Sequence, residues 1–270
     1  MILLEMLSYP FLVRAFLVGV LVSLCAALLG TSLVLKRYSM IGDGLSHVGF
    51  GALAIASALG VAPLAVAVPV VVVAAVLLLR VSQSGKVRGD AAIALISSGA
   101  LAVGVLVISL TSGVNTNVSN YMFGSILTIS GSDAVLSVIL CAAVLVVFTL
   151  FYPRIFAVTF DETFARATGT KAEGYNMLLA ILTAITVVLG MRMMGALLIS
   201  SLIIFPALSA MRVFRSFRSV TVCSAVLSVV CFTLGMTLSY ALETPSGASV
   251  VAVNIIAFAL FALAGRLLRR

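Results

Sequence analysis

Residues Val61–Leu79 read VAPLAVAVPVVVVAAVLLL, a run with no charged side chain. Its length matches the roughly 20 apolar residues that an α-helix needs to cross the hydrocarbon core of a bilayer. The run also lacks the alternation of apolar and polar positions that a strand of a membrane β-barrel requires. This stretch therefore predicts a membrane-spanning helix, and with it an all-α fold.

The whole chain has the same apolar character. Of its 270 residues 63% are hydrophobic and only 9% are charged, and the mean hydropathy is +1.32. Soluble domains are about 45–50% apolar and roughly a quarter charged, and disordered chains are poor in apolar residues. The composition excludes a soluble enzyme, a soluble binding module and a disordered chain. Because no loop is long enough to form a second domain, residues 1–270 are expected to form a single transmembrane domain.

Apolar runs separated by Gly, Pro and charged residues give the expected crossings. They are residues 11–35, 44–60, 62–79, 91–110, 134–152, 175–191, 193–211, 219–240 and 249–265. Two of these runs, 44–60 and 175–191, are short and interrupted by glycine, so one of them can be re-entrant if protein surrounds it. The sequence predicts a polytopic bundle of eight to nine spans.

The basic residues orient this bundle. With nine crossings and the C-terminus inside, every Lys and Arg except Arg14 and Arg192 falls on the cytoplasmic side. This is the asymmetry of cytoplasmic loops, so the net charge of +8 indicates a protein of the cell (inner) membrane in contact with lipid. It does not indicate a nucleic-acid-binding protein.

Two loops differ from the otherwise short connections. Asn115–Asp133 is polar and expected on the outer face, whereas Pro153–Tyr175 is the longest charged segment and lies on the inner face. In the inner loop, Thr159 or Asp161 can begin a short helix that runs to about Ala167. Such a helix starts at a capping residue and stops at a glycine.

The stop of this short helix would be Gly169, and its charged residues can support one another at helical spacing. These charged residues are Asp161, Glu162 and Arg166. Pattern alone leaves two interpretations open. The segment is either a solvated connector or a helix that lies across the cytoplasmic face and docks a partner.

The segment Gly42–Gly51 (GDGLSHVGFG) contains Asp43 and the only histidine of the chain, His47. Residues four apart lie on one face of a helix. An ionisable side chain at the centre of a membrane costs on the order of 2.5–3.5 kcal/mol, so such residues are functional candidates. A carboxylate and an imidazole together suit zinc, manganese or iron(II).

A simpler interpretation of the same pair is that Asp43 caps its helix and His47 hydrogen-bonds to it; spacing leaves both interpretations open. One chain also supplies too few ligands for a closed tetrahedral site. Two copies related by a twofold axis would supply four.

Several catalytic motifs are absent. The chain contains no G-x-x-x-x-G-K-[ST] motif, so it has no P-loop for ATP. With a single histidine it cannot build a two-histidine hydrolytic site, and no catalytic or cofactor-binding residues are predicted. If transport is driven by ATP, the ATPase must be another chain.

A resemblance rests on five segments in order. Lys36-Arg37-Tyr38-Ser39-Met40 followed by GDGLSH at 42–47 is similar to the second-helix signature of the membrane permeases of ABC-type zinc, manganese and iron(II) importers. The other four segments are Tyr121–Leu127 (YMFGSIL), the inner loop around Asp161–Gly169, Met194–Ala207 (MGALLISSLIIFPA) and Thr244–Gly247 (TPSG). The resemblance covers nearly the whole chain.

The resemblance implies an all-helical permease that works as a homodimer. It further implies a cytoplasmic ATP-binding cassette ATPase docked on inner loops, and an extracellular or periplasmic metal-binding protein that delivers the ion. Asp43 and His47 match the positions that contact the metal. Asp161, Glu162, Arg166 and Gly169 fall in the segment that matches the coupling helix. No cofactor is expected to be bound permanently, and ATP belongs to the partner chain.

Two other classes of function remain as alternatives. A proton-coupled secondary metal transporter can use Asp43 and His47 as a proton relay, because histidine titrates near neutral pH. It predicts no ATPase partner and usually an internal repeat, which the two halves of the chain do not show. An intramembrane enzyme needs a nucleophile–base pair or a complete metal site. The lack of a second histidine leaves the choice among zinc, manganese and iron(II) open.

Overall fold

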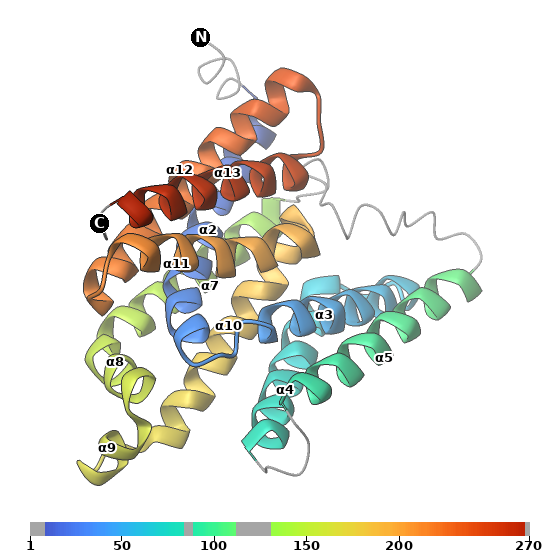
Figure 1. The fold of residues 1–270 in the computed structure, drawn as a ribbon. Helices are drawn as coiled ribbons and strands as arrows, with labels where there is room; N and C mark the ends of the chain where they lie inside the picture. Colours follow the sequence, from blue (N-terminus) through green and yellow to red (C-terminus); the bar gives the residue numbers. More distant parts are fainter. Residues whose placement is uncertain (1–8, 84–88, 112–130, 268–270) are drawn as a thin grey trace.

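The structure is a computed structural model that describes residues 9–83, 89–111 and 131–267. These residues form eleven helices and no strand (Figure 1). The helices are α2 (Pro10–Leu35), α3 (Ile41–Ala58), α4 (Pro63–Gln83), α5 (Gly89–Leu110), α7 (Gly131–Leu150), α8 (Tyr152–Phe160), α9 (Glu162–Ala167), α10 (Ala172–Met194), α11 (Ala196–Val213), α12 (Phe217–Leu242) and α13 (Ser246–Leu267).

Each of the nine predicted apolar runs corresponds to one long helix. Eight of these helices, all except α3, are long and apolar enough to cross a membrane. Helix α3 has 18 residues, which rise about 27 Å against a hydrocarbon core of about 30 Å. The prediction of an all-α bundle with eight to nine spans is confirmed. The run 175–191 is part of the 23-residue helix α10, so α3 is the element on which the span count depends.

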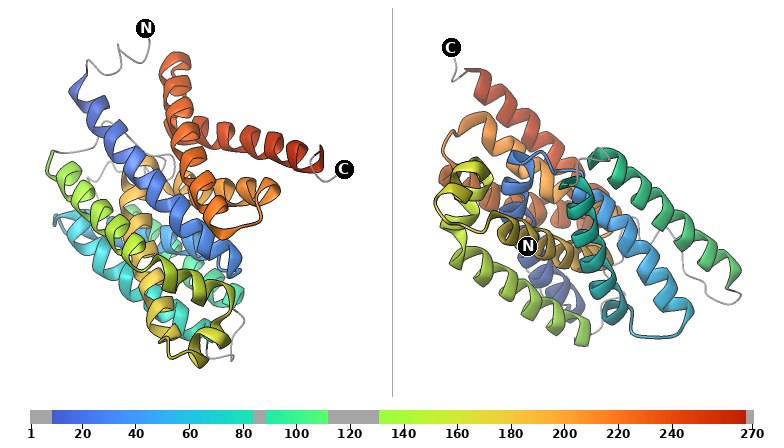
Figure 2. Two further views of the ribbon diagram at one scale, coloured as in Figure 1. Left: turned by 90° about the vertical axis from the view of Figure 1, so that its left-hand side faces the viewer. Right: turned by 90° about the horizontal axis from the view of Figure 1, so that it is seen from below.

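Helix α3 is enclosed by other helices. It packs against α4, α5, α10 and α11, and 13 of its 18 residues are buried. Figure 1 and the two views in Figure 2 show α3, α4 and α5 as one group, with α12 and α13 on the other side of the bundle. Because protein replaces lipid around most of α3, this helix can carry polar side chains that a lipid-exposed helix excludes.

Glycines set the closest helix contacts. A Cβ atom added at Gly51 of α3 would lie 2.8 Å from the backbone oxygen of Ala100 in α5. A Cβ at Gly30 of α2 would collide with the backbone oxygen of Ile203 in α11. Small residues at such points let helix backbones approach one another in a membrane, where van der Waals packing drives association.

We expect Gly30→Ala to destabilise the bundle, because the added methyl group meets backbone that cannot rotate away. Overpacking of this kind costs about 1–3 kcal/mol or more. Gly99→Ala in α5 is the matched control, since no atom lies within 4 Å of its added Cβ and alanine favours a helix over glycine. Thermal unfolding of the purified protein in detergent measures both variants. Equal unfolding temperatures for Gly30→Ala and the wild type would contradict this account of the α2–α11 contact.

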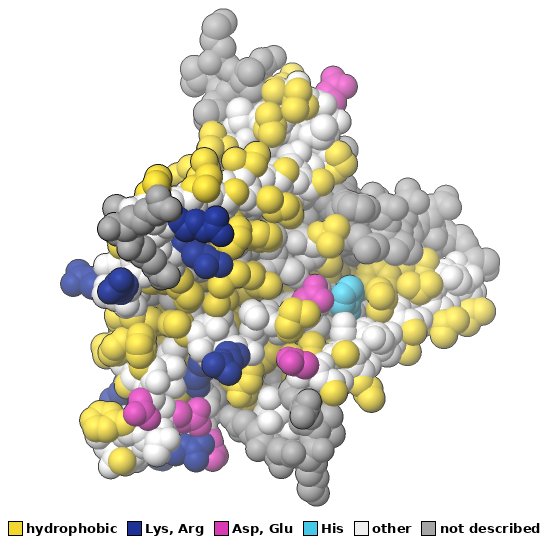
Figure 3. Space-filling view, viewed as in Figure 1, with side chains coloured by type: hydrophobic (Ala, Val, Ile, Leu, Met, Phe, Trp, Pro, Cys, Tyr) yellow, Lys and Arg dark blue, Asp and Glu magenta, His cyan; other side chains and the backbone are white. Residues whose placement is uncertain are grey.

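Charged residues distinguish the two ends of the bundle. Lys and Arg side chains gather toward one end in the space-filling view (Figure 3), and Arg80, Arg212 and Arg266 each lie in the last turn of a long helix. The positive-inside rule places this end in the cytoplasm. At the other end, Arg192 of α10 forms an ion pair with Asp133 of α7 at 2.7 Å, a contact that the sequence did not predict.

Candidate functional site

Asp43 and His47 lie one turn apart near the start of α3. The His47 Nε2 and Asp43 Oδ2 atoms are 3.8 Å apart, which is longer than a hydrogen bond. The side chain of Asp43 is 42% exposed and that of His47 is 23% exposed. Figure 3 views the face on which the histidine lies beside an acidic side chain. The two groups therefore point the same way and remain accessible, as the spacing predicted.

The helix-capping interpretation of Asp43 is wrong. Met40 is the N-cap residue of α3, and no side chain caps the helix. The carboxylate of Asp43 instead accepts a hydrogen bond at 3.1 Å from the hydroxyl of Ser200, which lies on α11. The same hydroxyl lies 3.2 Å from the Ala196 carbonyl of its own helix, so the Asp43 carboxylate and this carbonyl share one donor. Sequence reasoning missed the contact with Asp43, since a serine in an apolar helix is expected to bond to its own backbone, as Ser200 also does.

One chain supplies only two metal-ligating side chains at this place. Within the described ranges, no group of three or more His, Cys, Asp or Glu residues is close enough to hold a metal ion. Asp43 and His47 together offer a carboxylate oxygen and an imidazole nitrogen, which fit a borderline divalent ion such as Zn²⁺.

An apolar groove of about 420 Å³ lies between α11 and α13. Ser200 belongs both to this groove and to the Asp43 contact. The other residues that line the groove are Leu197, Ser201, Ile204, Phe205, Ala248, Val251, Ala252 and Ile255. Ser200 therefore connects the Asp43 carboxylate to an apolar, open surface.

A second set of candidates lies at the cytoplasmic end, on α9. The Asp161 Oδ1 atom accepts a hydrogen bond from the backbone N–H of Phe164 at 2.9 Å, so Asp161 is the N-cap residue. Thr159, the other predicted start, belongs to α8. Gly169 has a φ of +84° just after the helix ends, in the left-handed region that favours glycine. The short helix is where the sequence placed it.

Glu162 joins α9 to the rest of the protein. Its carboxylate forms ion pairs with Arg166 at 2.7 Å and with Lys36 at 3.3 Å, and it accepts a hydrogen bond from Asn176 Nδ2 at 3.0 Å. Arg166 also lies 3.7 Å from Glu173. The predicted support between Glu162 and Arg166 is confirmed. Asp161 takes no part in it, because its carboxylate caps the helix.

Burial alone would raise the pKa of Glu162. The hydrogen bond from Asn176 and the positive charges of Lys36 and Arg166 outweigh that effect and hold the pKa below its ordinary value. Glu162 is therefore ionised at neutral pH. Its links to Lys36 and Asn176 had no signal in the sequence, because these residues come from α2 and α10.

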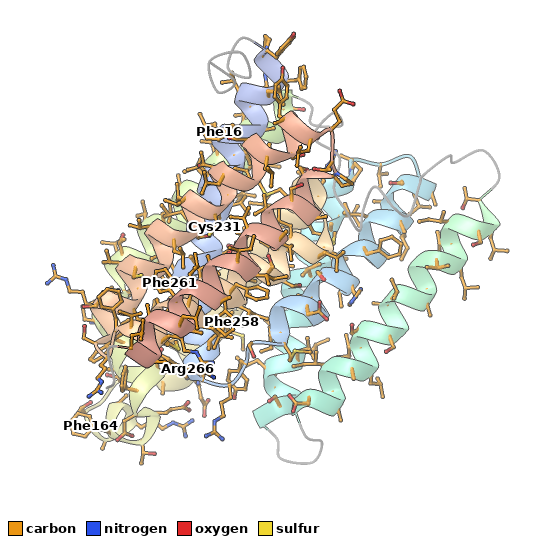
Figure 4. All side chains as sticks on the ribbon, turned by 45° about the horizontal axis from the view of Figure 1, so that its top comes forward. Phe16, Phe164, Cys231, Phe258, Phe261 and Arg266 are labelled. Atoms are coloured by element: carbon orange, nitrogen blue, oxygen red, sulfur yellow. The ribbon has the colours of Figure 1, made fainter. Side chains whose placement is uncertain are left out.

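The cytoplasmic end also exposes aromatic side chains. Phe164 of α9 is 64% exposed and lies at the same end of the bundle as Arg266 (Figure 4). Phe156 and Phe160 of α8 are also exposed. They contact each other and the buried ring of Phe217 in tilted or edge-on arrangements, with ring centroids 5.0–6.1 Å apart. Exposed apolar side chains outside the membrane-spanning helices indicate an interaction surface.

Comparison with known proteins supports the same fold and class. The model of the ABC 3 transport family matches residues 8–265. The manganese transport system membrane protein MntC of Halalkalibacterium halodurans is 28% identical over 96% of this chain and 88% of its own length. The high-affinity zinc uptake system membrane protein ZnuB of Haemophilus influenzae is 29% identical over 93% of this chain and 97% of its own length.

A solved structure, described as PsaBC from Streptococcus pneumoniae in complex with Fab, superimposes with a TM-score of 0.85 at 25% identity. The match covers 96% of this chain and 95% of that one. Of the segments that carried the resemblance, Tyr121–Leu127 lies outside the described residues. The match over nearly the full length, together with eight helices able to cross a membrane, shows that this multi-pass membrane protein belongs to the ABC 3 transport family.

Proposed function

We propose that this chain is the membrane permease of an ATP-driven importer for a divalent transition metal ion, with zinc foremost and manganese or iron(II) as alternatives. The observation that carries the proposal is the accessible Asp43–His47 pair on the enclosed helix α3. Relatives named for manganese transport and zinc uptake support it.

The metal ion is the cargo of this protein, so it must bind and leave again. A carboxylate and an imidazole from one chain make a weak, incomplete site. Two copies facing each other across a twofold axis would bring two Asp43 and two His47 side chains to one ion. In this arrangement the second copy would also cover the apolar groove beside Ser200.

ATP hydrolysis belongs to a separate cytoplasmic ATPase that docks on α9 and the exposed Phe164. An extracellular or periplasmic metal-binding protein delivers the ion to the opposite end. Affinity purification of the tagged chain from its native membrane, followed by mass spectrometry, tests the first of these partners. A stoichiometric P-loop ATPase is expected. Its reproducible absence from a folded, dimeric chain would favour the proton-coupled transporter instead.

Uptake in proteoliposomes tests which metal ion the protein transports and whether ATP drives the transport. Vesicles that contain the chain and its ATPase are supplied with Zn²⁺, Mn²⁺ or Fe²⁺, with ATP and the metal-binding protein on the appropriate sides. ATP-dependent uptake that a protonophore does not abolish is expected. Uptake that follows an imposed proton gradient without ATP would overturn the proposal.

Ser200→Ala should lower metal uptake by about tenfold. The substitution removes the hydroxyl that holds Asp43, and supporting partners of metal ligands are worth about 10–100-fold in affinity or activity. Ser201→Ala is the matched control, because the Ser201 hydroxyl, like that of Ser200, bonds to a carbonyl of its own helix but lies outside the contact with Asp43. Radiolabelled metal uptake, corrected for the amount of protein in the membrane, compares the two. Equal uptake by both variants would show that Ser200 does not position the ligand.

A further inference from the structure

Lys36 is a buried cation that connects two distant parts of the chain. It is the C-cap residue of α2, and its side chain is only 8% exposed. Its Nζ atom forms the 3.3 Å ion pair with Glu162 of α9 and also donates a hydrogen bond to Asn176 Oδ1 of α10. The ammonium group therefore sits where the ends of α2, α9 and α10 meet.

The segment after Lys36 is a tight turn that leads directly into α3. Arg37 adopts a φ of +61°, a left-handed conformation that is uncommon for a residue other than glycine. The backbone N–H of Tyr38 donates to the Leu33 carbonyl at 2.8 Å, and that of Ile41 donates to the Tyr38 carbonyl at 3.0 Å. These bonds tie the turn to both helices, so a short hydrogen-bonded segment joins Lys36 to the start of α3.

Stability alone does not account for an ion pair whose cation is enclosed by protein while its carboxylate is 34% exposed. Burial lowers the pKa of Lys36, and the charge of Glu162 opposes that effect only in part. Replacing a buried ion pair by apolar groups is often neutral or stabilising. The benefit of Lys36 lies instead in fixing the position of α9 relative to the turn.

We infer that Lys36 is a positioning residue for transport, whose contacts with Glu162 and Asn176 carry movement of α9 into the α2–α3 turn and so to Asp43. The inference rests on the proposed function. Asp43 follows Lys36 by seven residues, which makes this the short covalent route from the cytoplasmic helix to the candidate metal ligands. A second route, through α10, begins at Asn176.

Lys36→Met tests the link in proteoliposomes that contain the chain and its ATPase. Arg166 and Asn176 still hold Glu162 in this variant, so ATPase binding should persist and ATP hydrolysis should change by no more than about twofold. Zinc uptake per ATP hydrolysed should fall about tenfold or more. Glu162→Gln removes the other charge of the pair, so zinc uptake by the Lys36→Met, Glu162→Gln double variant should be no lower than that of the weaker single variant, because contacting residues are not additive. Arg218→Met, an exposed cation at the same end, is the control and should remain coupled.

A labelling experiment reads the movement without relying on transport. Met40 lies in the turn and is 52% exposed, and Cys223 is the one native thiol that is not buried. In a Cys223→Ser background, the rate of thiol labelling at Met40→Cys should differ between the nucleotide-free and ATP-bound states, and Lys36→Met should remove that difference.

Two results would overturn the inference: wild-type coupling in Lys36→Met, or a labelling change that survives the substitution. Failure of the wild-type vesicles to take up any metal would instead contradict the proposed function, and the labelling comparison would still decide the role of Lys36.

Discussion

Replacing His47 by alanine is expected to lower metal uptake about a hundredfold, while normal amounts of folded chain reach the membrane. His47 supplies the only imidazole nitrogen of the chain. Loss of a group that merely supports a ligand already costs about 10–100-fold, so loss of the ligand itself should reach the upper end of that range. Uptake of radiolabelled zinc and manganese, with immunoblotting for the chain, measures the effect.

Ile55→Ala is a matched control for this variant. Ile55 lies on the same helix and its side chain is also partly exposed, but it carries no ligand atom. Uptake by the control should stay within about twofold of the wild type. Unchanged uptake by His47→Ala would remove the histidine from the mechanism, whatever the outcome for the control.

The same substitution tests whether two copies share one site. A dimer with one wild-type and one His47→Ala chain loses one of four ligands if the copies face a single ion. Its uptake should then fall nearly as far as that of the dimer with two substituted chains. Half of the wild-type uptake would show that each copy has its own separate pathway.

The fold was predictable because each crossing is a local property of the chain. Runs such as Val61–Leu79 satisfy the length and polarity that a bilayer demands without help from other segments. The uncertainty in the span count comes from α3, where Asp43, His47 and several glycines reduce the hydropathy. Its place in the bundle depends on packing against four other helices, which no local pattern reveals.

The candidate site likewise combines features that a local sequence pattern predicts with contacts between distant residues that it does not. The four-residue spacing of Asp43 and His47 fixed their shared direction, and the capping pattern around Asp161 located α9. Ser200 is 157 residues from Asp43, and Lys36 is 126 residues from Glu162, so tertiary structure alone brings these pairs together. Helix α8 (Tyr152–Phe160) was not predicted. Its first residue is also the last residue of the apolar run 134–152, so no break in the sequence pattern marks the start of a new helix.

Charge reversal on α9, by Asp161→Lys together with Glu162→Lys, is expected to reduce co-purification of the ATPase about tenfold or more. Loss of the Asp161 cap costs roughly 1 kcal/mol, and a helix of six residues is not stable without its surroundings. A lysine at 162 would also face Lys36 and Arg166 instead of pairing with them. The helix should therefore leave its position, and the docking surface that includes Phe164 should be lost.

The affinity for the metal-binding protein should stay nearly unchanged in this double variant, because that partner is expected at the opposite end of the bundle. Glu173→Lys is the matched control. The Glu173 side chain is 78% exposed, and it contacts α9 through its 3.7 Å approach to Arg166. ATPase binding by this variant should therefore be close to normal.

Gly169→Val should reduce ATPase binding in the same direction as the double variant but more weakly, since a left-handed conformation costs a non-glycine residue about 1–2 kcal/mol. Retention of the ATPase after replacement of the whole segment 161–169 would show that docking occurs elsewhere, and α9 would then have to be assigned another role.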